Sequence, residues 1–134
     1  MKRALRRSVV LSLSVLSLAA APKHRTWLER AQADKKTARL ANPYQGQAEA
    51  VRAGAKLFQR YCSSCHGTEA TGLRRNPSLH SPTVKNASPG ALYWLLQNGS
   101  LRRGMPSWSF LPPEQRWQLV TWLKTLEFPH GKKP

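Results

Sequence analysis

The run Cys62-Ser63-Ser64-Cys65-His66 constrains this chain more than any other part of its 134 residues. Two cysteines that are separated by two residues and followed directly by histidine form the C-x-x-C-H signature of covalent haem attachment. The thiols of Cys62 and Cys65 can add to the two vinyl groups of the porphyrin, and the imidazole of His66 then falls beneath the iron. We therefore expect one haem c per chain, held covalently by Cys62 and Cys65, with His66 as an axial iron ligand.

Other uses of the two cysteines fit the sequence less well. A redox dithiol of the thioredoxin type expects a strand-helix-strand context, and no segment here shows the alternation of a strand. A zinc site would need two more ligands in similar register, and none is present. A disulfide is the usual role of two cysteines in an exported protein, but their spacing and the histidine that follows favour haem.

A second axial ligand should come from far down the chain, because the loop and a middle helix must first wrap around the haem. Four side chains qualify: Met105, His80, His24 and His130. Met105 is favoured because it lies in Gly104-Met105-Pro106, where glycine allows a close backbone approach and proline fixes the turn that aims the thioether. His80 is the chief alternative, and it could equally be a surface loop histidine.

The first 21 residues have the layout of a secretory leader. Four cations, Lys2, Arg3, Arg6 and Arg7, precede an apolar and small-residue stretch over residues 9–21. This stretch is shorter than the roughly 20 apolar residues that a membrane-spanning helix needs, so a cleaved signal peptide is the better interpretation and an uncleaved anchor the alternative. Export to the periplasm follows from either, with membrane anchoring in the second case.

The charge of the chain is strongly positive, with 22 Lys and Arg against 6 Asp and Glu and a formal net charge of +16. Such a field suits nucleic acid, an anionic membrane surface or an acidic protein. Export argues against nucleic acid. We therefore expect an acidic redox protein as partner, and membrane association through the leader or the basic surface stays open.

Apolar spacing and helix signals predict an all-α chain. One amphipathic helix covers residues 47–61, a second begins at Ser88 and Pro89 and ends at Asn98-Gly99, and a third runs from Pro113 to about Leu126. Residues 67–87 are rich in loop formers. The domain division expected is as follows: 1–21 signal peptide or N-terminal anchor, 22–45 basic extension, 46–128 haem domain, and 129–134 basic C-terminal tail.

Residues 42–126 resemble class I cytochromes c, and especially the bacterial single-haem domains related to the cytochrome c subunits of terminal oxidases. The matching residues are Asn42-Pro43-Tyr44, Glu49-Ala50, Gly54, Phe58, CSSCHG, Pro77-Ser78-Leu79, Trp94, Asn98-Gly99, GMPSW at 104–108 and the segment 114–126. The resemblance implies the cytochrome c fold, with three to four short helices wrapped around one covalently bound haem. The loop at Thr68–Gly72 is shorter than in the family, and Pro112-Pro113 replaces its usual Ser or Thr cap.

The resemblance also implies two specific contacts. The first and last helices should cross where Gly54 and Phe58 meet Trp122. The carbonyl of Pro77 should accept the Nδ1 proton of His66 and orient its ring.

With His66 and Met105 on the iron, no position is open for a substrate, and thioether ligation favours the ferrous state. The expected function is single-electron transfer between respiratory or dehydrogenase partners, without catalysis. One alternative is a fixed haem relay subunit of an oxidoreductase complex, and another is a haem protein that reacts with peroxide or gases. Four cations, Arg74, Arg75, Arg102 and Arg103, are expected around the haem edge, where a membrane-bound oxidase or a periplasmic dehydrogenase could dock.

Overall fold

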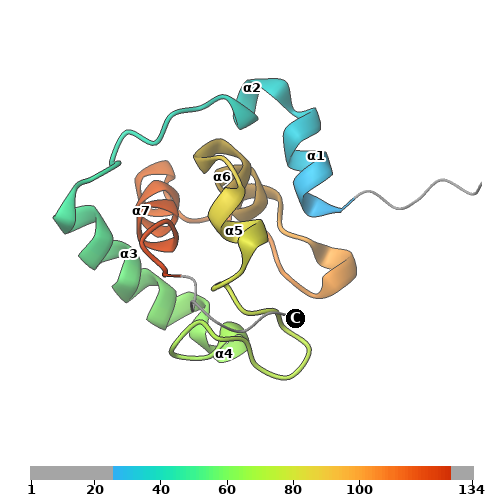
Figure 1. Cartoon of the computed structure of the whole chain (residues 1–134), viewed down its shortest axis with the longest axis vertical. Coiled ribbons are helices and arrows are strands. Elements are labelled where there is room, and N and C mark those ends of the chain that lie inside the picture. The colour runs from blue at the N-terminus through green and yellow to red at the C-terminus, as the bar shows by residue number, and fades with distance from the viewer. Residues whose placement is uncertain (1–25, 128–134) are drawn as a thin grey trace, which may run out of the picture.

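The computed structural model describes residues 26–127, and within them every regular element is a helix. The elements are α1 (Trp27–Ala33), α2 (Lys35–Ala38), α3 (Ala48–Tyr61), α4 (Ser63–His66), α5 (Pro82–Asn86), α6 (Pro89–Asn98), the 3-10 helix η1 (Leu101–Arg103) and α7 (Pro113–Leu123). Figure 1 shows these helices arranged around a central region, with long connections between them. The all-α prediction is confirmed, and the three longest helices, α3, α6 and α7, are the three that the sequence predicts.

Local signals explain where the middle and last helices begin. The Ser88 hydroxyl accepts a hydrogen bond from the amide of Ala91 at 3.1 Å, with Pro89 in the first turn, so α6 starts as expected. Helix α7 begins after Pro112 without a side-chain cap. It ends at Leu123 rather than near Leu126, because the chain then tightens into turns whose amides reach back only three residues.

The long connection between α4 and α6 contains a helix that the composition conceals. Ser81 caps the amide of Val84 at 3.3 Å and Pro82 occupies the first turn of α5. The buried Val84 anchors this single turn to the core. The sequence suggested a loop over residues 67–87, but Pro82–Asn86 within it form a helix.

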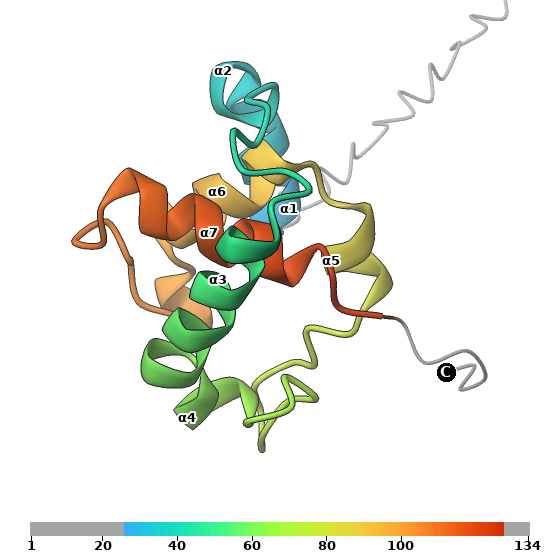
Figure 2. The same cartoon turned by 90° about the vertical axis from the view of Figure 1, so that its left-hand side faces the viewer.

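Helices α3 and α7 cross at very close range, and Figure 2 shows α3 in front of α7. A Cβ added at Gly54 would lie 2.7 Å from Trp122 Cβ, closer than real side chains approach. One turn further along α3, the ring of Phe58 lies 4.3 Å from that of Trp122. The crossing implied by the cytochrome c resemblance is confirmed, and glycine is required there because any side chain would force the helices apart.

Much of the remaining core lies between α6 and α7. Tyr93 stacks on Trp117 with ring centroids 4.3 Å apart. The buried guanidinium of Arg116 donates to the Tyr93 hydroxyl at 2.7 Å and to the Ser109 carbonyl at 3.0 Å. This network ties α6, α7 and the segment before α7 into one unit, which carries one side of the cavity described below.

Candidate haem site

A cavity of about 650 Å³ lies between the helices, within the usual size range for small-molecule and cofactor sites. Its lining includes Cys62, Cys65 and His66 from the end of α3 and from α4, and Met105 from the loop after η1. Pro77 lines it as well. All five side chains that the sequence singles out for the cofactor therefore meet at one cavity, although 43 positions separate the outermost two.

The C-x-x-C-H segment forms a single helical turn at the end of α3. Cys62 ends α3, with its amide donating to the Phe58 carbonyl at 2.8 Å, and its own carbonyl accepts the amide of His66 at 2.9 Å. Residues three and four apart share one face of a helix, so this turn presents Cys65 and His66 on the side of Cys62. No disulfide joins the two cysteines. Burial raises the pKa of the Cys62 thiol to about 11, with a smaller contribution from Cys65.

His66 is held by the loop that follows it. Its Nδ1 lies 3.0 Å from the carbonyl oxygen of Pro77. A carbonyl can only accept, so Nδ1 carries the proton and Nε2 keeps its lone pair for a metal. The loop closes through Gly72, whose φ of +92° favours glycine and whose amide donates to the His66 carbonyl at 2.9 Å.

Met105 is fixed by a two-residue bridge with Ser100. The Ser100 amide donates to the Met105 carbonyl at 2.8 Å, and the Met105 amide donates to the Ser100 carbonyl at 3.3 Å. The close backbone approach that the sequence predicted at Gly104 occurs at another glycine nearby. Gly104 has no neighbour that would meet a Cβ and is needed for its φ of +80°, whereas the close approach occurs at Gly99, where a Cβ would lie 2.6 Å from Pro106.

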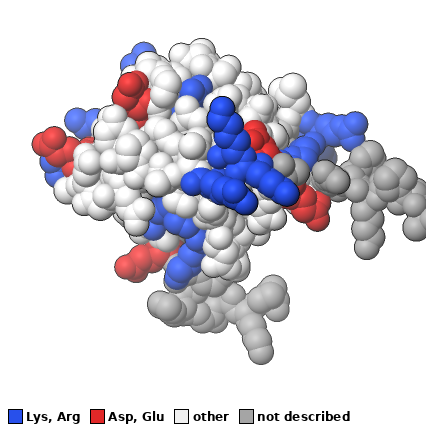
Figure 3. All heavy atoms as spheres, turned by 90° about the horizontal axis from the view of Figure 1, so that it is seen from above, with Lys and Arg blue, Asp and Glu red and all other residues white. Residues whose placement is uncertain are grey.

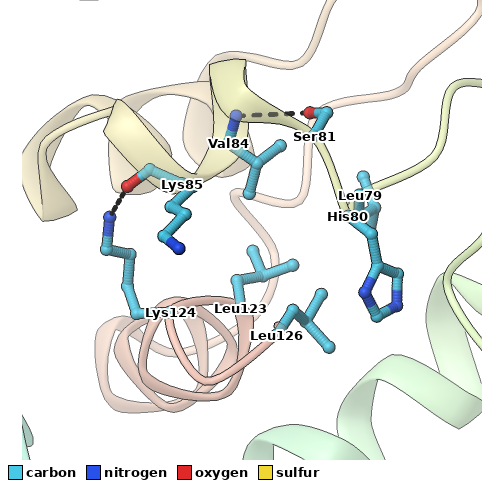
Figure 4. Close-up of a pocket in the computed structure, with 8 residues that line it drawn as sticks. All are labelled: Leu79, His80, Ser81, Val84, Lys85, Leu123, Lys124 and Leu126. Carbon is cyan, nitrogen blue, oxygen red and sulfur yellow. Dashed lines mark hydrogen bonds between the residues drawn. The ribbon is translucent and has the colours of Figure 1, made fainter. Parts of the chain in front are cut away.

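His80 lies outside this cavity. Its Nδ1 is 2.6 Å from the Glu127 carbonyl and its Nε2 is 2.9 Å from the Glu69 carbonyl, so backbone oxygens occupy both ring nitrogens. Figure 4 shows His80 at a separate small pocket next to α5 and α7, where Lys124 Nζ donates to the Lys85 carbonyl. The other two alternatives, His24 and His130, fall outside the described residues.

The part of the lining that α6 and α7 supply consists of leucines rather than tryptophans. Five leucines of α6 and α7 line the cavity: Leu92, Leu95, Leu96, Leu119 and Leu123. The tryptophans of the same helices, Trp94, Trp117 and Trp122, are absent from that lining and pack in the core instead. Sequence composition alone could not separate these two roles, because both residue types repeat at helical spacing.

Residues from two further segments line the cavity without having been predicted from the sequence. Trp27 and Leu28 come from the N-terminal extension, and Ser100 comes from the loop before Met105. Trp27 and Leu28 were visible only as the large apolar residues of an otherwise polar segment. Nothing in the sequence distinguishes Ser100 from an ordinary loop serine.

The cavity suits a large, flat, mostly apolar cofactor that also carries acceptor groups. Its leucine lining would contact the porphyrin ring. Ser100 is 7% exposed and its Oγ has no hydrogen-bond partner within the protein. Buried hydroxyls are rarely left unpaired, and the carboxylates of a haem would supply the acceptor that Ser100 lacks. The residues present therefore fit a haem.

Two solved structures resemble the fold. Cytochrome cL from the marine methylotrophic bacterium Methylophaga aminisulfidivorans is 24% identical, with 79% of this chain and 71% of that chain covered at a TM-score of 0.56. Cytochrome cL from Hyphomicrobium denitrificans is 22% identical, with 65% of this chain and 53% of that chain covered at a TM-score of 0.57. At these identities the likeness shows a common fold, which is the cytochrome c fold expected from the sequence.

A family comparison goes further. Residues 49–123, more than half of the chain, match the sequence model described as cytochrome c oxidase, cbb3-type, subunit III. Members of this domain family bind haem c covalently and carry electrons rather than catalyse reactions. The predicted cofactor and the electron-transfer character are thus confirmed, and the chain belongs to this family of single-haem class I c-type cytochromes.

Proposed function

We propose that this protein is a periplasmic single-electron carrier in which Cys62 and Cys65 hold the haem and His66 and Met105 occupy both axial positions of its iron. The observation that carries the proposal is that His66 and Met105 line one cavity and are each locked by the backbone of a neighbouring segment. Of the sixth-ligand alternatives, His80 is directed elsewhere by two carbonyls.

The hydrogen bond between His66 Nδ1 and the Pro77 carbonyl oxygen prepares the histidine to act as an iron ligand. The Pro77 carbonyl holds the proton on Nδ1, fixes the ring plane and makes the imidazole a stronger donor through Nε2. A ligand held in this way needs no rearrangement when the redox state changes. Rigid placement of both axial side chains favours fast electron transfer.

Met105 supplies a neutral thioether from a loop that the Ser100 bridge and the proline after it hold in place. The haem, when bound, supplies the one-electron couple. Leucines of α6 and α7 exclude water from the cavity. A coordinated thioether would leave no open iron position for a substrate. This arrangement supports electron transfer over reaction with peroxide or gases.

Visible absorption tests the axial ligands. The oxidised holoprotein should show the weak sulfur-to-iron absorption in the far red that methionine ligation gives in this family. Met105→Ala should abolish it, and His80→Ala should retain it because His80 lies outside the cavity. Absence of the absorption from the wild-type holoprotein, or its survival in Met105→Ala, would assign the sixth position to another side chain.

The proposed partner is an acidic redox protein. Arg74, Arg75, Arg102 and Arg103 are all exposed, and Arg103 also lines the haem cavity. Figure 3 looks down on the end of the molecule that carries α2 and shows Lys and Arg side chains gathered there too. Such charges steer association, so the rate of electron transfer to a partner should fall as salt shortens the Debye length to about 8 Å and below.

One alternative has a specific observation in its favour. The matched family is named for a subunit of a cbb3-type oxidase, which suits a haem relay fixed within a complex. Purification from native membranes in high salt separates the two possibilities, since a fixed subunit stays with its complex and a steered carrier is released. Release as a soluble haem protein supports the carrier.

Periplasmic location remains part of the proposal. The predicted leader lies outside the described residues. Within residues 26–127, no helix has the length and apolar character needed to cross a bilayer. The N-terminal sequence of the mature protein from the periplasmic fraction would test both export and cleavage.

A further inference from the structure

The N-terminal extension contributes side chains to the haem cavity. Thr26, Trp27 and Leu28 line the same cavity as His66 and Met105. Trp27 and Leu28 are half-buried and pack against the hydrophobic core. The residues at the start of α1 are thus part of the site, although they precede the C-x-x-C-H motif by more than 30 positions and lie outside the matched family region.

Helix α1 is held in a defined position. Thr26 and Glu29 form a reciprocal cap, with the Glu29 amide 3.2 Å from Thr26 Oγ1 and the Thr26 amide 2.7 Å from Glu29 Oε2. This cap fixes the first turn, which carries Trp27 and Leu28. On the same helix, Ala31 is completely buried within the core cluster. A helix of seven residues would not persist alone, so these contacts decide its placement.

Helix α2 fastens α1 to α6. The Ser88 hydroxyl donates to the carbonyl of Ala38 at 2.9 Å. Gly90 lies so close to the Thr37 carbonyl that a Cβ there would overlap the oxygen. The extension therefore seats on the N-terminal end of α6, the helix whose leucines line the cavity. Figures 1 and 2 both place α1 and α2 toward the end of the molecule away from α4, which carries Cys65 and His66.

We propose that α1 is a built-in wall of the haem cavity, with Trp27 and Leu28 covering the haem periphery on the side away from the cysteine attachment. The ferric haem carries one more positive charge than the ferrous haem, and water stabilises the more highly charged form. By excluding water, the wall raises the reduction potential and restricts contact with small redox reagents. The inference rests on the proposed placement of the haem in this cavity.

The test uses full-length holoprotein. In Trp27→Ala the reduction potential should fall, and oxidation of the reduced protein by ferricyanide should accelerate several-fold, because water and reagent reach the haem edge. Leu28→Ala, a milder truncation, should shift both quantities in the same direction. Gly90→Ala should do so as well, since the added Cβ pushes Thr37 and the extension away while Gly90 itself does not line the cavity.

Trp94→Ala is the matched control, because Trp94 also packs against the core but does not line the cavity. It should leave potential and oxidation rate unchanged. The proposal is contradicted if Trp27→Ala and Leu28→Ala both have the reduction potential and oxidation rate of the wild type. It is also contradicted if Trp94→Ala shifts these two quantities as much as Trp27→Ala does. Failure of the proposed axial ligation would be seen separately, as a missing far-red absorption in the wild type. In that case the comparison of Trp27→Ala with Trp94→Ala still tests whether α1 shields the haem.

Discussion

Ser100 and Met105 face each other across an isolated antiparallel bridge and exchange both backbone hydrogen bonds, at 2.8 and 3.3 Å. In such a pair the two side chains emerge on the same side of the ladder. The Ser100 hydroxyl and the Met105 thioether therefore line the same part of the cavity. The bridge holds Met105 through main-chain atoms, so the Ser100 side chain can be changed without removing this support.

Ser100→Ala should destabilise the holoprotein by about 1–3 kcal/mol, because a buried hydroxyl paired with a haem carboxylate contributes roughly that amount. Denaturant unfolding of wild type and variant measures the difference. The far-red absorption should persist, since the backbone bridge remains. If no acceptor reached Ser100, the substitution would remove an unpaired buried hydroxyl and stability would stay level or rise.

Gly72→Ala should weaken the contact between Pro77 and His66. A Cβ at Gly72 would lie 2.8 Å from the Asn76 carbonyl oxygen and 3.1 Å from the Pro77 carbonyl carbon, so the loop must move. Because the hydrogen bond makes His66 a stronger donor to ferric iron, its loss should raise the reduction potential.

Gly46→Ala is the control for this variant. Gly46 has a positive φ of +78°, but a Cβ there would meet nothing within 4 Å. Both variants should lose about 1–3 kcal/mol from backbone strain. Only Gly72→Ala should change the potential. Equal potentials in the two variants would contradict a role for the Pro77 carbonyl in tuning the iron.

Gly54→Ala tests the crossing of α3 and α7 through the sign of its effect. Alanine in place of glycine within an exposed helix stabilises it by about 1 kcal/mol. At Gly54 the added methyl meets Trp122 and the backbone of Gln118, and overpacking typically costs about 1–3 kcal/mol. Unfolding measurements should show net destabilisation, and a more stable variant would mean that the helices can separate freely.

Features recorded in local sequence were predictable. The C-x-x-C-H turn is continuous in the chain, and the Ser88 cap with Pro89 announces α6 within three residues. Met105 was favoured as the second ligand by its Gly104-Met105-Pro106 turn, although no local rule brings positions 66 and 105 together. The contact between Pro77 and His66 came from the resemblance, since many loop carbonyls could have met that nitrogen.

Features decided by tertiary packing were not predictable. Helices α1, α2, α4 and α5 have seven residues or fewer, a length at which nucleation cost outweighs intrinsic propensity. The entry of Trp27 into the cavity depends on how α2 seats against Gly90, a contact between positions 53 apart. Expecting the close approach at Gly104 rather than Gly99 was wrong because the sequence does not show which glycine faces the returning chain.

The acid stability of the α1 wall should depend on Asp34. Its carboxylate caps α2, accepting from the Thr37 amide at 3.0 Å and from the Thr37 hydroxyl at 3.0 Å. The backbone bond from Thr37, then its hydroxyl, hold the pKa of Asp34 below the ordinary value of 3.8. A carboxyl whose pKa is lowered by folding stabilises the fold above its unfolded pKa, and that contribution is lost as pH falls through the folded pKa.

Asp34→Ala should therefore be less stable than wild type from neutral pH down to about pH 4, with the gap closing at lower pH. Asp34→Asn keeps a capping oxygen, so it should lie closer to wild type at neutral pH and lack this part of the acid dependence. Thermal unfolding midpoints of the three holoproteins between pH 7 and pH 3 measure the effect. The other carboxylates titrate in all three proteins, so only the differences matter. If the difference in unfolding midpoint between wild type and Asp34→Ala stayed constant down to pH 3, the α2 cap would not depend on the charge of Asp34.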